Sequence, residues 1–437
     1  TGVQTCALPI YLMEACRLGL SVPPGFVLPV GLCRVFHGAG ERLPADAMER
    51  VREGVATLES ATGRRFGDPD APLLLSVRSG AAVSMPGMLD SLLNVGLTPS
   101  VFEAWKATEP ELALDCQARM LAQVGEIVHR FPTDPDTGQT PFDEARYALE
   151  RDREQADALE AKAELVARYR QLLADHPWPD DAWDQLELAL VAVLRSWNNE
   201  RARGYRRQHG IDGALGTAVT IQTMVFGNRD ERSATGVALT RDPSTGERRF
   251  CGEYLARAQG EDVVSGARTP VAIDSRSEPF AARFPDAHAQ LEQMRARLEH
   301  HFRDLLELEF TVESGQLWLL QIKRAQRSPA AAFRVAVDMV DEGLLREPEA
   351  LLRVSTDDVE DLLEPRLDPG SDAKAVARGL PACPGAASGK VTFSASCMVP
   401  MQPVHINAYS EIPGSLLPVL STNDPLDGLT VKEVRLG

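Results

Sequence analysis

The sequence predicts an α+β protein, because helical and strand-rich patterns occupy different stretches of the chain. Residues from about 102 to 176 are highly charged and keep an approximate helical period. From Gly216 to Lys323 the chain instead alternates short apolar runs with turn residues, as strands do. A third observation is the segment 73–96, in which a buried strand leads into small residues.

The composition is that of an ordinary globular protein, with 437 residues of which 44% are hydrophobic and 25% charged. This length predicts roughly two to four domains. The net charge of −17 argues against a nucleic-acid or anionic-membrane partner, so an anionic substrate would need a local cationic pocket. No apolar run is long enough to span a bilayer. Seven scattered cysteines without a CxxC pair predict reduced thiols and a cytoplasmic protein.

The segment 73–96 is the most informative part of the chain. Leu73 to Arg78 reads as a buried strand, and Ser79 to Ala82 reads as a loop of small residues that a ligand can approach closely. A second stretch with turn residues, at 85–88, precedes an expected helix that contains Leu89, Leu92 and Leu93. An arginine at a strand end, facing a small-residue loop, suits a polyphosphate.

The rest of the chain predicts the remaining elements. Residues 1–10 do not fit the pattern that begins at Tyr11, where a short helix and a turn at 23–26 lead into a strand. We expect the region 102–176 to be a solvated helical insertion without catalytic residues, and a further helix to cover 181–210. Strands are expected at 218–225, with alternating apolar and polar residues, and at 233–239.

Residues 307–323 predict a β-hairpin with a three-residue loop, Glu313–Gly315, and a G1 bulge. A two-residue turn would place Gln321 beside Leu308 and scramble both faces, so the bulged register is preferred. The apolar face in this register is Leu308, Phe310, Val312, Trp318, Leu320 and Ile322. The polar face is Glu307, Glu309, Thr311, Gln321 and Lys323. Carboxylates at i and i+2 with a cross-strand amide form a hard-oxygen cluster suited to Mg²⁺ and a nucleotide.

Several long strings resemble one enzyme family, the pyruvate, phosphate dikinases. The strings are SVRSGAAVSMPGM (76–88), ALTRDPSTGE (238–247), GEYLARAQGEDVVSGARTP (252–270) and LPACPGAASGKVTF (380–393). The resemblance runs from Tyr11 to Ala395. It implies an ATP-grasp nucleotide-binding domain of two lobes over 11–325, with the helical insertion at 102–176. It also implies a helical connector at 326–370 and the start of a phosphohistidine domain at 371–395, while 396–437 stay unassigned.

The resemblance also implies site residues. Arg78 would contact the nucleotide phosphates and act in catalysis. The other implied nucleotide-binding residues are Gln222, Met224, Glu253, Gln259, Glu307, Glu309 and Gln321. Glu307, where the family usually has aspartate, and Glu309 would hold Mg²⁺. Lys323, where the family usually has arginine, and Arg119 fall at positions implicated in phosphate binding, although the surroundings of Arg119 favour an arginine on a helix surface.

In this family ATP gives its β-phosphoryl group to a histidine and its γ-phosphate to inorganic phosphate, and the histidine then phosphorylates pyruvate. The implied partners are therefore ATP and inorganic phosphate, with pyruvate bound only by a further domain, in enzymes that form homo-oligomers. None of the eight histidines has the GGxxSHAA-type context of the carrier histidine, so we expect this chain alone not to complete the reaction. The alternatives are a phosphoenolpyruvate synthase-type dikinase, which uses water as acceptor, and a non-catalytic nucleotide-binding fragment.

Overall fold

The computed structural model describes residues 8–83, 85, 87–151, 158–264 and 268–363, together with three short strands nearer the C-terminus. The chain divides into two compact units. The first comprises Thr1–Thr133, Gln139–Pro243 and Glu247–Gln326, and the second comprises Asp134–Gly138, Ser244–Gly246 and Arg327–Gly437. Within the described residues, no helix is both long and apolar enough to cross a membrane.

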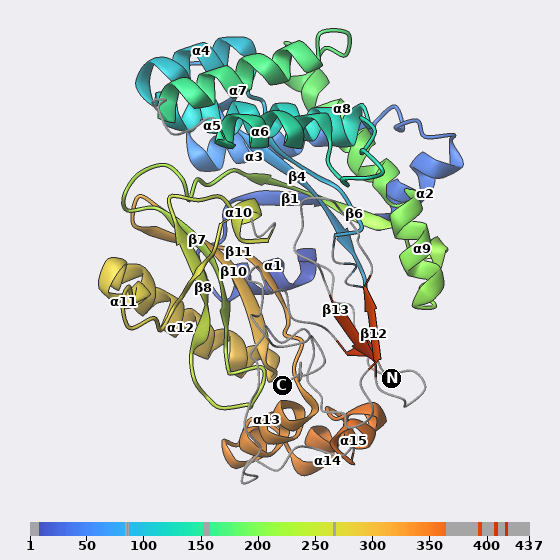
Figure 1. Ribbon diagram of the computed structural model, residues 1–437, viewed down its shortest axis with the longest axis vertical. Helices are drawn as coiled ribbons and strands as arrows, with labels where there is room; N and C mark the ends of the chain where they lie inside the picture. Colours follow the sequence, from blue (N-terminus) through green and yellow to red (C-terminus); the bar gives the residue numbers. More distant parts are fainter. Residues whose placement is uncertain are drawn as a thin grey trace. The chain divides into compact units, whose positions relative to one another are not determined.

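The first unit contains two antiparallel sheets (Figure 1). One has the order β1-β6-β4-β5, with β1 at Gly25–Leu28, β6 at Thr217–Thr223, β4 at Leu75–Ala81 and β5 at Ser91–Val95. The other has the order β11-β10-β7-β8-β9. Its strands are β11 (Gln316–Arg324), β10 (Leu306–Glu313), β7 (Ala234–Leu239), β8 (Cys251–Ala256) and β9 (Val271–Ala272). A short parallel pair, β2 (Arg65–Phe66) and β3 (Pro72–Leu73), completes the strands described in this unit.

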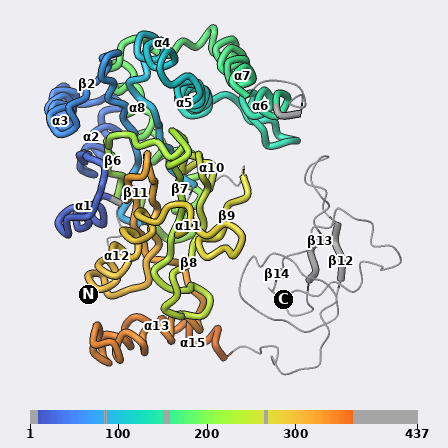
Figure 2. Tube along the Cα trace, turned by 90° about the vertical axis from the view of Figure 1, so that its left-hand side faces the viewer, coloured from blue at the N-terminus to red at the C-terminus, as the bar shows by residue number. Residues whose placement is uncertain are grey.

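Helices cover both sheets of the first unit. Against the first sheet pack α2 (Val30–Gly38), α3 (Ala47–Thr62) and α8 (Ala182–Ser196). Against the second pack α1 (Leu8–Arg17), α11 (Phe280–Arg283) and α12 (Pro285–Phe302). Figure 2 shows α1 beside α12, where Tyr11 and Phe302 place their ring centroids 4.7 Å apart. Further helices are α9 (Glu200–Gln208), η2 (Gly213–Leu215) and α10 (Gly260–Val264).

A separate helical layer has its own core and includes α4 (Pro99–Thr108), α5 (Pro110–Gln123), the π-helix η1 (Val124–Val128), α6 (Pro141–Arg151) and α7 (Ala158–Leu172). The prediction of helices here is confirmed, but the prediction that they are solvated is wrong for α5. Nine of its residues, from Leu112 to Gln123, are buried, because α4 and α7 pack on either side of it.

The second unit is described by itself as three helices, α13 (Pro329–Asp341), α14 (Glu347–Leu351) and α15 (Thr356–Leu363), and a small sheet. The sheet strands are β12 (Thr392–Ala395), β13 (Ile406–Tyr409) and β14 (Leu416–Leu417). The helices agree with the expected connector. Most of the predicted phosphohistidine segment at 371–395 and of the tail at 396–437 lies outside the described residues. Mixed helices and antiparallel sheets confirm the α+β class.

The segment 73–96 differs from its prediction in two places. Ser79, Gly80 and Ala81 are not a loop but the end of β4, where they pair with β6. A Cβ on Gly80 would lie 2.9 Å from Cδ of Pro9, so this small residue makes room for the protein's own helix α1 rather than for a ligand. That helix begins at Leu8, inside the ten residues that seemed extraneous.

The expected helix at 89–93 is also wrong, because Ser91–Val95 form strand β5. Leu92 is buried opposite Val77 of β4, and the turn before it is made by Gly87 with φ +69°. A short apolar run such as this does not distinguish a strand from a helix by its period. Likewise, the single helix expected at 181–210 is two helices, since Asn199 caps the N-terminus of α9.

The hairpin forms, but its register differs from the prediction. The turn has two residues, Ser314 and Gly315, both with positive φ, as a type I′ turn requires. The buried positions of β11 are therefore Leu317, Leu319 and Ile322, and Trp318 is only partly buried, so the prediction that its ring belongs to the core is wrong. Glu309 still faces Gln321, because one extra residue on β11 corrects the register after the turn.

Candidate functional site

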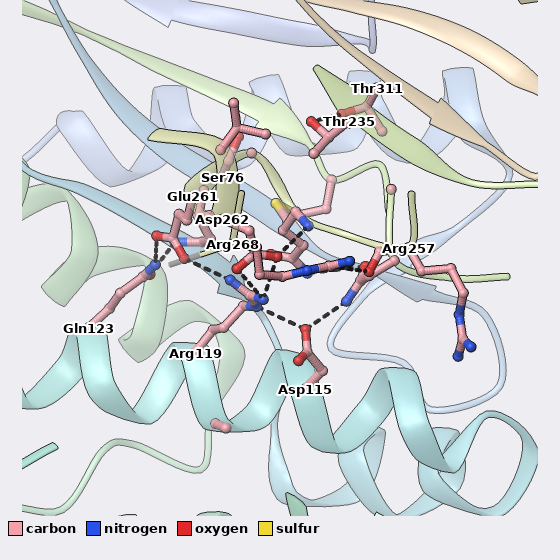
Figure 3. A pocket seen from close by; sticks show the side chains of 18 of the residues that line it. Ser76, Asp115, Arg119, Gln123, Thr235, Arg257, Glu261, Asp262, Arg268 and Thr311 are labelled. Atoms are coloured by element: carbon pink, nitrogen blue, oxygen red, sulfur yellow. Dashed lines mark hydrogen bonds and ion pairs between the residues drawn. The ribbon is translucent and has the colours of Figure 1, made fainter. Parts of the chain in front are cut away.

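The two sheets and the helical layer of the first unit line a cavity of about 1570 Å³ (Figure 3). Its walls come from strands β4, β5 and β6 of one sheet, strands β7, β10 and β11 of the other, and helices α5, α7 and α10. The volume exceeds the roughly 300–1,000 Å³ of pockets for drug-sized ligands, so it can take a larger molecule.

Arg78 reaches from one sheet to the other across this cavity. It lies on β4, and its guanidinium donates through Nη1 to the carbonyl oxygen of Leu320 at 3.3 Å and through Nη2 to Oε1 of Gln321 at 2.9 Å. The nearest carboxylate oxygen is Oε2 of Glu309, 3.7 Å from Nη2. Arg78 and Glu309, both expected at the nucleotide site, therefore lie close to each other. A planar cation is thus held mainly by neutral acceptors in a cavity wall.

Glu307 and Glu309, the two carboxylates predicted to hold the metal, have different surroundings in the structure. Glu309 lines the cavity, whereas Glu307 does not and instead forms an ion pair of 2.8 Å with Lys323. Across the described residues there is no group of three or more His, Cys, Asp or Glu side chains that could hold a metal ion. Glu309 is therefore the carboxylate of the pair that a metal brought in by a ligand could contact.

Arg119 lies in the opposite wall, on α5, and is not the surface arginine that its surroundings favoured. It donates through Nε to Asp115 at 2.8 Å and through Nη2 to both carboxylate oxygens of Asp262 at 2.9 and 3.0 Å (Figure 3). Glu261 lies 3.5 Å from Nη1. Burial alone would lower the pKa of the guanidinium, but these carboxylates raise it above its ordinary value. Arg119 is thus paired with acids of the protein itself.

Two glutamates of the same wall have a raised pKa. Burial is the main cause for Glu261 on α10, although Arg119 and a hydrogen bond from Gln123 act in the opposite direction. Burial also raises the pKa of Glu126 on η1, against the effect of a 2.8 Å hydrogen bond from Thr140. In the π-helix, the close packing of the Phe142 ring on Gly125 leaves no room for a Cβ. Burial therefore disfavours the charged form of both glutamates.

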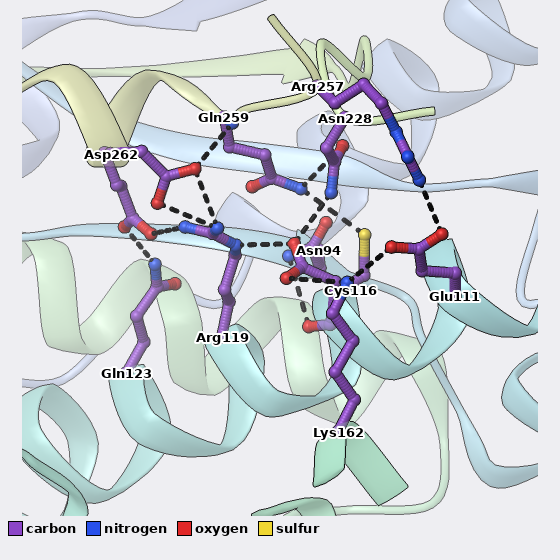
Figure 4. A network of polar contacts seen from close by, with 12 residues as sticks. Asn94, Glu111, Cys116, Arg119, Gln123, Lys162, Asn228, Arg257, Gln259 and Asp262 are labelled. Carbon is purple, nitrogen blue, oxygen red and sulfur yellow. Dashed lines mark hydrogen bonds and ion pairs between the residues drawn. The ribbon is translucent and has the colours of Figure 1, made fainter. Parts of the chain in front are cut away.

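A chain of charges extends this wall away from Arg119 (Figure 4). Lys162 on α7 lies 3.1 Å from Glu111 and 3.9 Å from Asp115, both on α5. Glu111 also accepts a hydrogen bond of 2.5 Å from Arg257, which follows β8. Three elements distant in sequence are joined by these ion pairs, so the helical layer is tied to the second sheet.

Among the other predicted residues, Gln222 and Met224 lie on or just after β6 and line the cavity. Gln222 is buried, and its side-chain amide donates to the carbonyl of Pro23 at 2.9 Å. Met224 is 8% exposed and packs in the core of the helical layer as well. The strand itself is buried on both faces, so its expected alternation of exposed and buried residues is not observed.

Gln259 and Glu253 have different positions. Gln259 is buried in the cavity wall, where its amide nitrogen lies 3.4 Å from Sγ of Cys116 and 3.4 Å from Oδ1 of Asn228. Its oxygen Oε1 has no hydrogen-bond partner among the residues that the structure describes. Glu253 is exposed on β8 and does not line the cavity. Of the two, only Gln259 is positioned to meet a ligand there.

Sequence reasoning named Arg119 but missed its neighbours on α5, Asp115 and Gln123, together with Asn228 and Asp262. A signal was present, because Asp115, Arg119 and Gln123 recur every four residues and so share one face of a helix. The remaining positions of that helix are mostly apolar. A polar stripe on an otherwise apolar helix indicates a buried polar site rather than a solvated surface.

Comparison with known proteins agrees with this geometry. Residues 39–283 match the family described as "Pyruvate phosphate dikinase, AMP/ATP-binding domain". The chain is also 41% identical over 396 residues to the pyruvate, phosphate dikinase of Rhizobium meliloti (strain 1021) and 39% identical over 396 residues to that of Clostridium symbiosum. It is 42% identical over 390 residues to the chloroplastic pyruvate, phosphate dikinase 1 of Oryza sativa subsp. japonica.

Each of these matches covers 88% of this chain but only 40–44% of the relative. The chain thus spans less than half the length of the curated relatives it matches. The family match nevertheless includes β4, β5 and β6 of the first sheet, β7, β8 and β9 of the second sheet and the helical layer, and therefore most of the residues that line the cavity. Strands β1, β10 and β11 lie outside the matched range. On these grounds the chain belongs to the family of pyruvate phosphate dikinase AMP/ATP-binding domains.

Proposed function

We propose that the cavity binds ATP in an ATP-grasp arrangement, with the nucleotide between the two sheets, as the nucleotide-binding part of a pyruvate, phosphate dikinase. The observation that carries this proposal is the position of Arg78, which bridges β4 and β11 inside the cavity. A guanidinium in such a position can bind phosphate oxygens and stabilise charge that develops in phosphoryl transfer.

The remaining residues suit a nucleotide in this orientation. Gln222 and Met224 offer an amide and an apolar surface for the adenine, and the unpartnered oxygen of Gln259 can accept a hydrogen bond from the ligand. Gln321 already contacts Arg78 and would share its phosphate. Glu253, which is exposed on β8, would need a movement of the chain to take part.

Mg²⁺ is the metal that this site would use. A Mg²⁺ ion that arrives with nucleotide phosphates needs only one or two protein carboxylates, since water and phosphate oxygens complete its coordination. Glu309 can supply the first, and Glu307 the second if it leaves Lys323. When bound, the ion would neutralise phosphate charge during transfer.

A role in binding inorganic phosphate is less well supported for Arg119 and Lys323. Arg119 already contacts three carboxylates, and Lys323 pairs with Glu307 outside the cavity lining. Either residue would have to exchange a protein carboxylate for the phosphate. We keep both as predicted phosphate contacts of the complete enzyme, and we expect Arg119 to serve first as a structural tie between α5 and α10.

The proposed reaction of the complete enzyme converts ATP, phosphate and pyruvate into AMP, diphosphate and phosphoenolpyruvate through a phosphohistidine. The relatives are named pyruvate, phosphate dikinases, which favours phosphate over water as the second acceptor. A cytoplasmic location and homo-oligomers of the full-length enzyme remain predictions.

Calorimetric titration of the 437-residue chain with ATP and Mg²⁺ tests the proposal, with Arg78→Met as the variant and Arg78→Lys as its conservative partner. We expect saturable binding by the native chain and a loss of about tenfold or more in Arg78→Met, since a hydrogen bond to a charged group contributes about 1.5–3 kcal/mol. Arg78→Lys should fall between the two. Absence of MgATP binding by the folded native chain, or equal affinity in Arg78→Met, would refute the proposal.

A further inference from the structure

Strand β11 contains one residue more than its partner strand. Between the turn and the bulge, Leu319 lies opposite Phe310, and on the other side of the bulge Gln321 lies opposite Glu309. Phe310 and Glu309 are neighbours on β10, so Leu320 is an extra residue without a partner in the ladder.

The packing of the sheet does not require this extra residue. The buried positions of β11 include Leu317, Leu319 and Ile322, and side chains alternate between the two faces of a strand. If Leu320 were absent, Leu319 and Ile322 would both be buried and Gln321 between them would face the cavity, as the alternation of a regular strand requires. Every cross-strand pair of the hairpin would stay the same. A cause for the bulge must therefore lie outside the core.

That cause lies on the cavity side. The bulge lets two successive residues, Leu320 and Gln321, line the cavity together. Arg78 uses both of them, because its Nη1 donates to the Leu320 carbonyl and its Nη2 donates to the Gln321 side chain. Two acceptors next to each other in the chain thus match the two terminal nitrogens of one guanidinium.

The chemistry of the two acceptors matters as much as their spacing. Both are neutral amide oxygens, so they fix the direction of the guanidinium without neutralising its charge. A carboxylate in the same place would compete with an incoming phosphate for the cation. Arg78 is 19% exposed in its side chain, which leaves it open to a ligand in the cavity.

We propose that the β-bulge at Leu320 is a positioning element that holds Arg78 in the direction of the nucleotide phosphates. This inference rests on the proposed phosphate-binding role of Arg78. Leu320 itself takes no part in the chemistry, since it acts through its backbone carbonyl. The bulge is therefore a specificity device for phosphates rather than a device for the stability of the sheet.

The test compares deletion of Leu320 with Leu320→Ala, which keeps the bulge and its carbonyl but removes the side chain. Affinities for MgATP and for adenosine are measured by calorimetry in the native chain, both variants, Arg78→Met and the deletion combined with Arg78→Met. We expect the deletion to weaken MgATP binding about tenfold with adenosine affinity unchanged, and to add no further loss in Arg78→Met. Leu320→Ala should keep the native ratio of MgATP to adenosine affinity.

Three results would overturn the inference. They are native MgATP affinity in the deletion variant, a selective loss of MgATP affinity in Leu320→Ala, and full additivity of the deletion with Arg78→Met. Native MgATP affinity in Arg78→Met itself would instead refute the role of Arg78 on which the inference rests.

A measurement on the native chain covers the case in which the deletion variant does not fold. In arginine-labelled protein, the NMR signals of the two Nη groups of Arg78 are assigned by their loss in Arg78→Met. These signals should be separate, because the hydrogen bonds to Leu320 and Gln321 restrict rotation about the bonds to Cζ. The same separation is expected in Leu320→Ala. A single averaged signal in the native chain would contradict the inference.

Discussion

Two of the arginines that line the cavity, Arg78 and Arg119, lie in different walls, and their partners differ in kind. Arg78 in the sheet wall is held by two neutral oxygens, with one carboxylate 3.7 Å away. Arg119 in the helix wall contacts three carboxylates, two of them at hydrogen-bond distances of 2.8–3.0 Å. Both side chains have the same exposed fraction, 19%, so burial does not distinguish them.

The difference shows that a cation in a cavity is available to a ligand only if the protein has not already neutralised it. The charge of Arg78 is available to a phosphate, whereas the charge of Arg119 is balanced by carboxylates of α5 and α10. The sheet wall is supported by apolar packing behind the strands, and the helix wall has ion pairs in addition to its own apolar core. The predictions below test this contrast, in order of decreasing effect.

The largest effect is expected from Phe310→Ala in the sheet wall. The Phe310 side chain is fully buried, lies 5.5 Å from the Phe280 ring between centroids, and fills the space above Gly236. Truncation should lower the free energy of unfolding by about 3–5 kcal/mol, with little dependence on salt. Urea unfolding at two salt concentrations measures both quantities.

Trp318→Ala is the matched control in the same hairpin, because the side chain is only partly buried. We expect it to cost about half as much as Phe310→Ala or less, since less apolar area is lost. An equal or larger cost for Trp318→Ala would mean that the hairpin has the opposite register.

A smaller effect is expected from Asp262→Asn in the helix wall. Asp262 accepts two hydrogen bonds from Arg119 and one from the backbone of Gln259. The substitution should lower the free energy of unfolding by about 2 kcal/mol, the scale of hydrogen bonds to charged groups. Glu187→Gln, on the exposed face of α8, is the control and should change it by less than about 0.5 kcal/mol. A loss in Asp262→Asn no larger than in this control would contradict the assignment of ion pairs as the support of this wall.

The smallest effect concerns the pH dependence of Glu261→Gln. A carboxyl whose pKa is raised in the folded state stabilises the fold below its unfolded pKa, and this contribution is lost as the pH rises through the folded value. Glu261→Gln removes that loss, so the variant should be more stable than the native chain at pH 7 and equal to it below about pH 4.5. We expect a gain of less than about 1 kcal/mol, because the side chain is partly exposed. A gain in stability of Glu261→Gln that appeared only at acidic pH would contradict the raised pKa of Glu261.

The sequence predicted the sheet wall well because its strands carry their own signals. The strand that ends near Arg78, the strand at 217–223 and the hairpin all follow from runs of apolar and turn residues. The register of the hairpin could not be predicted from these runs. Ser314 adopts a left-handed conformation that makes a two-residue turn possible, and the bulge at Leu320 then restores the pairing of Glu309 with Gln321. Neither feature has a marker in the residue pattern.

The helix wall was not predicted, for a different physical reason. Asp115, Arg119 and Gln123 are the residue types of a solvated helix, and only the packing of α4 and α7 around α5 makes them interior. Asp262, which pairs with Arg119, is 143 residues away from it in the sequence. The four-residue spacing of these side chains indicates a shared helix face, but their long-range partners depend on tertiary structure and cannot be identified from local periodicity.

The most direct test of the contrast is a paired measurement on Arg78→Met and Arg119→Met, with the free energy of unfolding and the MgATP affinity determined for each. We predict that Arg78→Met loses about tenfold or more in MgATP affinity and little stability, because its hydrogen-bond partners are neutral and its carboxylate neighbour Glu309 is 3.7 Å away. Arg119→Met should lose about 3 kcal/mol of stability, because it leaves partly buried carboxylates without a counter-ion. Equal losses of affinity and stability in the two variants, or the reverse assignment, would contradict the claim that Arg78, and not Arg119, is available to a ligand.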